Sequence, residues 1–351
     1  MKKTRRDALK AAGAVAAVAA AGNLASGEFS PMVAETKGRE DAPDPDTKPR
    51  TKGLARGLTL LTMRRDGAYR LGVKTEKGVL DVYEAARVLK KPAPLTMDDL
   101  LQDEDGPRLM TLVGAAMESR GTKGIFLKEE SIEYGPAVTR PRKIVCVGLN
   151  YRRHAQEVGA QVPKQPVMFS KFNTALNHHN GTVKLPVDVA VKFDYEVELV
   201  IVMGKEARNV SEADALSYVA GYCTGNDFTA RDLQYETGGQ WLIGKTPDQF
   251  APLGPYLVTA DQVDPDNLKL ECRVNGETRQ SSNTNDMIAG TRHIISYYSK
   301  VVTLLPGDII FTGTPEGVIF GMPKDKQVWL KAGDKIACSV EKLGELRFEL
   351  V

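Results

Sequence analysis

The chain has 351 residues and a formal net charge of +2, with 42% hydrophobic and 26% charged residues. These values are typical of a globular protein, and they do not suggest the strongly basic surface of a nucleic-acid-binding protein. No apolar run reaches the ~18–20 residues that a membrane-spanning helix needs, so no membrane span is expected in the mature chain.

Residues 1–27 have the pattern of a secretory signal. A basic start precedes an Ala/Val run at residues 11–21, with small residues after it. The motif TRRDALK resembles the twin-arginine export motif, with Arg5 and Arg6 as the pair. We therefore expect the twin-arginine machinery as a partner and a periplasmic protein; a frayed Ala-rich helix is the alternative. Residues 1–21 carry a net charge of +4, which leaves about −2 on the rest of the chain.

Of the next two segments, the first is expected to be disordered and the second to be folded. Residues 28–55 are charged and Pro-rich without periodicity, which predicts a disordered linker. Residues 56–139 are expected to form a small N-terminal α/β domain. Its short alternating runs predict hairpins that lead into a helix. Two further helices are expected, PLTMDDLLQ with Thr96 as its cap and RLMTLVGAAMESRG ended by Gly121.

Residues 140–351 are expected to form the catalytic domain, and strands dominate there. Strands are predicted at 143–148, 166–170, 195–203, 217–224, 255–259, 267–274, 308–312 and 335–340. Helices are predicted near 151–158, 229–235 and 285–304. Strands and helices do not alternate regularly, so we predict an α+β, mainly β fold rather than a doubly wound sheet. No phosphate-binding glycine motif is present.

The chain has four cysteines, and none of them forms a CxxC pair: Cys146, Cys223, Cys272 and Cys338. A zinc knuckle or a thioredoxin-type redox site is therefore not supported. All four lie in strand-like runs, which predicts buried thiols. Export to an oxidising compartment would leave a disulfide as the alternative.

The strand KFDYEVELVIVMGK carries an acidic face that turns apolar. Asp194, Glu196 and Glu198 share one face with Val200 and Val202, so a purely solvated face does not explain them. Two carboxylates that lie about 6.5–7 Å apart on one strand repel unless a proton or a cation sits between them. Hard divalent cations prefer such oxygen ligands. The pattern therefore indicates a metal site.

Asp227 offers a third carboxylate just past an apolar strand. The alternative is that this aspartate caps the helix that follows. Thr229 and Asp232, however, have the spacing of a capping box and would serve that helix better. Asp227 is therefore predicted to be free to act as a ligand.

Three further motifs offer catalytic or binding groups. Asn150 can cap a short helix on which His154 and Glu157 are i,i+3 neighbours, and a carboxylate beside an imidazole makes a general base. The alternative is a surface ion pair. Lys245 follows a Gly-rich turn and can stabilise an oxyanion, unless it is a solvated loop lysine. Thr314 lies in a Gly/Thr/Pro loop that can hold a carboxylate, or is a plain turn.

Five segments together match one family in order and wording: CVGLNYRRHAQE, FDYEVELVIVMGK, AGYCTGNDFTARDLQ, GKTPDQFAPLGP and LLPGDIIFTGTPEGV. On these motifs, residues 140–351 resemble the fumarylacetoacetate hydrolase (FAH) family. The resemblance implies an FAH-type mixed β-sandwich roll and a homodimer. It also implies one divalent metal per subunit, Mg²⁺ or Mn²⁺ and in some members Ca²⁺, with no organic cofactor.

The resemblance also implies roles for ten residues. The implied metal ligands are Glu196, Glu198 and Asp227. The implied catalytic residues are His154, Glu157 and Lys245. The implied substrate contacts are Lys171, Arg231, Gln240 and Thr314.

Family substrates are 2-oxo or 2,4-dioxo carboxylates. Our first hypothesis is a metal-dependent hydrolase that cleaves a C–C bond in a 2,4-dioxo acid, acylpyruvate-like or a diketo sugar acid. The alternatives on the same site are an isomerase, hydratase or decarboxylase of 2-oxo acids, or an exported binding protein without catalysis. The export signal is unusual for a family that acts mostly in the cytosol.

Overall fold

The computed structural model describes residues 52–119 and 124–351. The predicted signal at residues 1–27, most of the predicted linker, and Gly121 lie outside the described residues. Residues 49–351 belong to one compact unit. Within the described part, strands outnumber helices, which confirms the predicted α+β, mainly β class.

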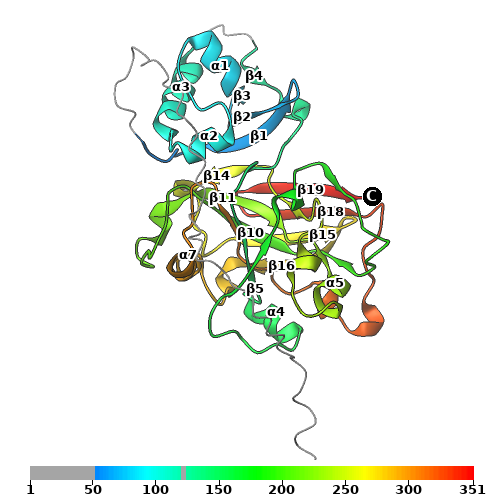
Figure 1. The fold of residues 1–351 in the computed structure, drawn as a ribbon. Helices are drawn as coiled ribbons and strands as arrows, with labels where there is room; N and C mark the ends of the chain where they lie inside the picture. Colours follow the sequence, from blue (N-terminus) through cyan, green and yellow to red (C-terminus); the bar gives the residue numbers. More distant parts are fainter. Residues whose placement is uncertain (1–51, 120–123) are drawn as a thin grey trace, which may run out of the picture. The chain divides into compact units, whose positions relative to one another are not determined.

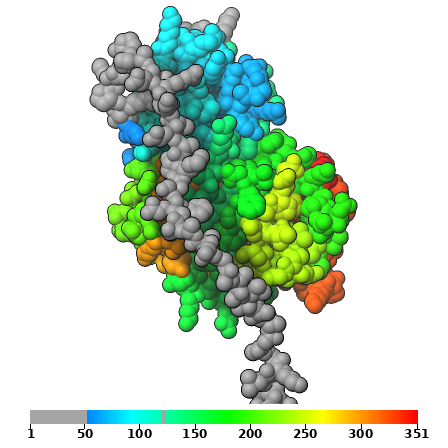
Figure 2. Space-filling view, in the orientation of Figure 1, coloured from blue at the N-terminus to red at the C-terminus, as the bar shows by residue number. Residues whose placement is uncertain are grey.

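The first described elements are three antiparallel strands and three helices, drawn in blue to cyan (Figures 1 and 2). The strands are β1 (Thr59–Arg65), β2 (Ala68–Thr75) and β3 (Gly78–Asp81). The helices are α1 (Val82–Leu89), α2 (Met97–Gln102) and α3 (Gly106–Glu118), followed by β4 (Phe126–Leu127). Thr96 and Asp99 form a complete capping box on α2, so the predicted cap is confirmed.

These strands continue into a ten-stranded sheet, whose order is β4-β3-β2-β1-β14-β11-β10-β17-β5-β6. Its other members are β5 (Ile144–Gly148), β6 (Val167–Lys171), β10 (Val197–Met203), β11 (Val219–Asn226), β14 (Leu257–Thr259) and β17 (Ile309–Phe311). The junction is the pairing of β1 with β14. The domain boundary near residue 140 stays a prediction.

A second sheet of five strands has the order β16-β15-β18-β19-β8. Its members are β8 (Gly181–Val183), β15 (Lys269–Val274), β16 (Glu277–Asn283), β18 (Lys335–Val340) and β19 (Gly344–Leu350). Two short pairs complete the strands: β9 (Phe193–Asp194) with β12 (Thr229–Ala230), and β7 (Leu176–Asn177) with β13 (Ala251–Pro252). β16 and β19 were not among the strands predicted from the sequence.

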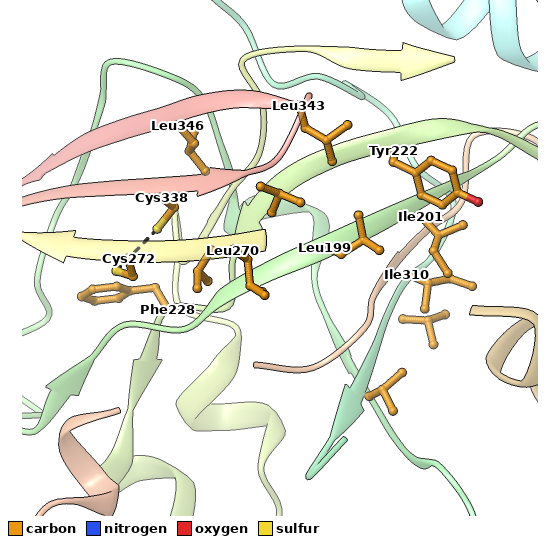
Figure 3. Packing of buried hydrophobic residues seen from close by; sticks show 14 of the residues in the cluster. Leu199, Ile201, Tyr222, Phe228, Leu270, Cys272, Ile310, Cys338, Leu343 and Leu346 are labelled. Carbon is orange, nitrogen blue, oxygen red and sulfur yellow. Dashed lines mark hydrogen bonds between the residues drawn. The ribbon is translucent and has the colours of Figure 1, made fainter. Parts of the chain in front are cut away.

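The two sheets pack against each other through apolar side chains. Figure 3 shows Leu199 and Ile201 of β10 in one cluster with Leu270 of β15 and Leu346 of β19. Val200, from the opposite face of β10, belongs to the other core cluster of the ten-stranded sheet. β10 is therefore buried on both faces, as its predicted alternation requires.

Four α-helices follow β4 in the described part of the chain: α4 (Arg152–Glu157), α5 (Arg231–Glu236), α6 (Leu242–Lys245) and α7 (Thr291–Val301). The helix predicted at 285–304 is shorter than expected, because a 3₁₀ turn at Thr284–Asp286 and an extended link come before α7. Among the described residues, no helix has the length and hydropathy to cross a membrane.

Two predicted helix caps are wrong. Asn150 does not cap α4; its side chain instead bonds the backbone of Ala289 and of Thr312, which ties three loops together. Thr229 and Asp232 do not form a capping box on α5. The Thr229 hydroxyl donates to the carbonyl of Asp227, and Asp232 accepts from a backbone N–H at Val191.

All four cysteines are free and buried, which confirms the prediction of buried thiols. Cys272 and Cys338 face each other across β15 and β18, with their sulfur atoms 3.7 Å apart (Figure 3). Asn226 donates to the sulfur of Cys338 at 3.2 Å and accepts from the backbone N–H of Glu196 at 3.3 Å. Asn226 therefore connects the cysteine pair to Glu196, which immediately precedes β10.

Candidate active site

Three carboxylates meet where β10 begins and β11 ends. Glu196 immediately precedes β10, Glu198 is its second residue, and Asp227 immediately follows β11. The antiparallel register pairs Val197 with Asn226, which places these residues side by side. One oxygen of each carboxylate lies within 4.8 Å of the others, and all three residues are buried.

This donor set fits a hard divalent cation. All three ligands are carboxylate oxygens, the type that Mg²⁺, Mn²⁺ and Ca²⁺ prefer. They converge from two neighbouring strands of one sheet, so the backbone holds their spacing. Three buried carboxylates would otherwise repel each other strongly. The residues predicted as metal ligands are therefore brought together by the fold.

Three buried cations surround the carboxylates. The Lys245 ammonium lies 2.7 Å from Glu196 and 2.8 Å from Asp227. Arg231 contacts the other oxygen of Glu196 at 2.6 Å, and Lys171 contacts Asp227 at 2.6 Å. Lys245 is thus not a solvated loop lysine. Buried ion pairs are costly to desolvate, so this cluster is better explained by function than by stability.

The charges drive the pKa values of the two glutamates in opposite directions. Burial raises the pKa of Glu198 well above its ordinary value, and the negative charges of Asp227 and Glu196 raise it further. Burial also acts to raise the pKa of Glu196, but Lys245 and Arg231 outweigh it and lower that pKa to about 2. Of the two glutamates, Glu198 is therefore the one whose neutral form is favoured by its surroundings.

The loop after β17 supports Glu198 from the other side. The backbone N–H of Gly313 donates to Glu198 at 2.7 Å. Gly313 has φ of +100°, and an added Cβ would lie 2.7 Å from that of Asn150. This position therefore requires glycine. The next residue, Thr314, donates to the carbonyl of Val197 at 3.0 Å and lines the same cavity as the triad.

The predicted dyad lies on α4. Nδ1 of His154 is 3.3 Å from the Glu157 carboxylate, whose other oxygen accepts from the backbone N–H of Gly317 at 2.9 Å. His154 is buried and lines the cavity together with the triad. The contact with Glu157 favours the tautomer with a proton on Nδ1, which leaves Nε2 as the basic nitrogen.

The cavity has a volume of about 30 Å³. It is lined by Val147, Gly148, Leu149, His154, Phe169, Glu196, Glu198, Asp227, Arg231, Gln234, Tyr235, Trp241, Lys245 and Thr314. Gln240, a predicted substrate contact, is exposed and lies outside this lining. The sequence offered no pattern for the aromatic members of the lining.

Lys171 does not line the cavity, although it was predicted to contact substrate. Its ammonium donates to the carbonyls of Phe228 and Phe250 at 3.0 and 2.9 Å, and to that of Lys245. An ammonium has three N–H donors, so none is left for a substrate in this arrangement. The ammonium also forms an ion pair with Asp227 at 2.6 Å, which indicates that Lys171 positions Asp227.

Two positioning residues were not assigned a role from the sequence. Asp194 is buried and accepts from Nε of Arg231 at 2.8 Å and from the backbone N–H groups of Ile319 and Phe320. Gln280 accepts from the backbone N–H of Val197 and donates to Thr314, each at 2.9 Å. A sequence pattern does point to Asp194, because it shares one strand face with the two glutamates. No such pattern points to Gln280.

Metal-dependent stabilisation is expected to grow as pH rises above the ordinary pKa of Glu198. Without a cation, the folded chain keeps the Glu198 proton above its ordinary pKa, while the unfolded chain loses it. A raised folded pKa gives stability at low pH that is lost as pH rises, and a bound cation removes this loss. The Tm difference with and without Mg²⁺ at several pH values measures the effect. A difference that is constant or shrinks with pH would contradict it.

Comparison with known proteins extends these findings. The sequence model of the "fumarylacetoacetate (FAA) hydrolase C-terminal" family matches residues 143–351. Oxaloacetate tautomerase Fahd2a, mitochondrial, of Rattus norvegicus is 44% identical over 252 residues, which span 72% of this chain and 78% of that protein.

Two solved structures are also similar. Fumarylacetoacetate hydrolase from Exiguobacterium antarcticum is 30% identical with a TM-score of 0.67, covering 84% of this chain and 99% of that one. Fumarylpyruvate hydrolase from Pseudomonas aeruginosa, solved with Mn²⁺ and pyruvate, is 34% identical with a TM-score of 0.55, covering 61% and 91%. These neighbours confirm the predicted type of fold.

Proposed function

Since this chain belongs to the fumarylacetoacetate hydrolase family, we propose that it is a divalent-metal-dependent isomerase that interconverts the keto and enol forms of a 2-oxo carboxylate such as oxaloacetate. The observation that carries the proposal is that the buried acidic triad and His154, which contacts Glu157, line one cavity. A relative 44% identical over 252 residues is an oxaloacetate tautomerase, which supports isomerisation ahead of our first hypothesis of hydrolysis.

Glu196, Glu198 and Asp227 would hold the cation. When bound, a divalent cation supplies Lewis-acid polarisation of the 2-oxo group. Mg²⁺ and Mn²⁺ both suit the ligands, and the Mn²⁺ of the Pseudomonas aeruginosa relative supports this class of ion.

The proton transfer is assigned to His154. In the direction from keto to enol, Nε2 takes a proton from C3 while the Nδ1–H donates to Glu157, and the imidazolium then gives a proton to the C2 oxygen. The negatively charged Glu157 stabilises the imidazolium between the two transfers. No water is consumed and no C–C bond is broken.

Lys245 provides positive charge beside the reacting oxygen. Burial acts to lower its pKa, but Asp227 and Glu196 more than reverse this, and the net pKa is raised. The ammonium therefore stays charged and stabilises negative charge that develops on the substrate. Arg231, fixed by Asp194, and Thr314 complete the polar lining.

Product analysis distinguishes isomerisation from hydrolysis. We would mix the purified protein with freshly dissolved oxaloacetate and follow the ultraviolet absorbance of the enol, with Mg²⁺, with Mn²⁺ and with chelator. Metal-dependent acceleration toward equilibrium over a protein-free sample is expected, with no more pyruvate, oxalate or acetate in the NMR spectrum than that sample contains. Absence of acceleration under all three conditions would refute the proposal.

Hydrolysis of an acylpyruvate is the second candidate. The same dyad can activate water instead of a C–H bond, and fumarylpyruvate hydrolase from Pseudomonas aeruginosa is 34% identical. This activity would release two acids in equal amounts from a 2,4-dioxo acid. The same NMR experiment with such a substrate tests it directly.

We also propose that the chain is exported in folded form by the twin-arginine machinery and works as a homodimer in the periplasm. The support is the TRRDALK motif in residues 1–27 and the family resemblance. The tautomerase relative of Rattus norvegicus is mitochondrial, which makes a direct test worthwhile. Replacing both Arg5 and Arg6 with Lys should trap the protein in the cytoplasm, as cell fractionation would show; unchanged export would contradict the motif.

A further inference from the structure

One part of the cavity wall is aromatic. The rings of Phe169 and Trp241 meet edge to face with centroids 5.6 Å apart, and Tyr235 meets Trp241 in the same way at 6.2 Å. Tyr235 also stacks on Phe320 at 4.9 Å. Phe169, Tyr235 and Trp241 all line the cavity that holds the triad and His154. The four rings therefore form one contiguous cluster, which we call the aromatic wall, and three of them line the cavity.

Trp241 occupies space that is available only because residue 148 is glycine. A Cβ added to Gly148 would lie 2.3 Å from Cζ3 of Trp241, closer than real Cβ contacts allow. The indole thus lies directly on the backbone at the end of β5, where the cavity lining passes. The indole therefore fills this part of the lining, and Gly148 leaves room for it.

The aromatic wall is coupled to the charged cluster. Trp241 is the residue that precedes α6, a helix of one turn that ends at Lys245. The Lys245 ammonium lies 5.3 Å from the centroid of Phe169, and the Arg231 guanidinium lies 5.4 Å from that of Phe320. Such cation–π contacts are attractive, so the cations that hold the carboxylates also hold the rings.

The space left inside is small. A cavity of about 30 Å³ accommodates an ion and little more than a water molecule, whereas sites for larger ligands span about 300–1,000 Å³. A short 2-oxo acid needs modest enlargement, but a bulky substituent would have to displace the aromatic wall. The wall therefore discriminates by size.

We propose that Trp241, resting on Gly148, sets the upper limit on substrate size and restricts the site to short 2-oxo acids without a bulky group at C3. This inference rests on the proposed function, because it assumes that a 2-oxo acid binds at the triad. Trp241 is a specificity residue here, and it takes no part in proton transfer.

The test compares oxaloacetate with phenylpyruvate, a 2-oxo acid that carries a ring on C3 and also tautomerises. In Trp241→Ala, the ratio of kcat/KM for phenylpyruvate to that for oxaloacetate should rise about 10- to 100-fold over the wild-type ratio, the range that pocket size can impose. Trp241→Phe should give an intermediate ratio. An unchanged ratio in an active Trp241→Ala protein would overturn the inference.

Ile243→Ala is the matched control. Ile243 lies on α6, the helix that directly follows Trp241; it is 51% exposed and does not line the cavity, so its truncation tests α6 without opening the aromatic wall. It should leave the ratio at the wild-type value. A rise equal to that of Trp241→Ala would mean that general loosening of α6, and not the indole, sets the limit.

A binding measurement separates this inference from the proposed function. If wild-type protein fails to tautomerise either acid, the proposed function fails, but thermal shifts with Mg²⁺ and oxalate or phenylpyruvate still report on size. Trp241→Ala should then gain a phenylpyruvate-dependent rise in Tm and keep the wild-type response to oxalate. No gain for phenylpyruvate, with the oxalate response intact, would overturn the size limit.

Discussion

Replacing Glu198 with Gln is expected to abolish metal-dependent stabilisation and to lower tautomerase activity by at least about 100-fold. Loss of a residue that only supports a metal ligand costs about 10–100-fold in affinity or activity, so loss of a ligand should cost more. The fold should survive, because burial raises the pKa of Glu198 and so favours a neutral side chain at this position. A glutamine amide oxygen can still accept from Gly313.

Thermal melting with and without Mn²⁺ measures the first effect, and the oxaloacetate assay measures the second. Glu349→Gln is the matched control, since Glu349 is an exposed residue of β19 that takes no part in the site. The control should keep the metal-dependent rise in Tm. A Glu198→Gln protein with wild-type metal response would show that the ion binds elsewhere.

Replacing His154 with Ala should lower kcat by about 10²–10⁴-fold, the usual contribution of a positioned general acid or base. Metal binding should be retained, because His154 lines the cavity and contacts Glu157 but is not one of the three carboxylates proposed to bind the ion. Steady-state rates at saturating Mg²⁺ give the catalytic loss, and the Tm shift with Mg²⁺ shows whether the site is intact.

Glu157→Gln is the informative companion. The amide oxygen can keep the contact with the Gly317 N–H, but the negative charge that stabilises the imidazolium is removed. The loss should therefore be smaller than that of His154→Ala, and combining the two changes should add little, because both act through one proton transfer. Full activity in His154→Ala would move the base to another residue.

The strand that holds the candidate metal site could be predicted from the sequence. The alternation of β10 places Leu199 and Ile201 in the core between the two sheets and Val200 in the other cluster, so the acidic residues had to share the face of Val200. The sequence also placed Asp227 just past the next long apolar strand, but the pairing of that strand with β10, which brings Asp227 to the glutamates, was not predicted. The family resemblance then supplied roles for the remaining residues of the site.

The contacts between distant segments could not be predicted in the same way. Asn150 has the ideal side chain for a helix cap, yet it bonds the backbone of residues more than a hundred positions later. Gln280 lies in a strand that the sequence pattern did not reveal and reaches both Val197 and Thr314. Trp241 packs on Gly148 at the end of β5, although the two residues lie far apart in the sequence. Such pairings depend on tertiary placement, which local propensity does not encode.

The position of β17 within the sheet has a consequence for how the chain is made. β17 lies between β10 and β5 and runs parallel to β5, and β19 runs parallel to β8. During synthesis, β5 and β10 therefore emerge long before the strand that joins them. Until β17 has been made, the edges of β5 and β10 that it joins have no strand partner. Long-range parallel pairings of this kind form slowly. Gly313 and Thr314 follow β17, so the hydrogen bonds that they donate to Glu198 and Val197 can form only late in synthesis.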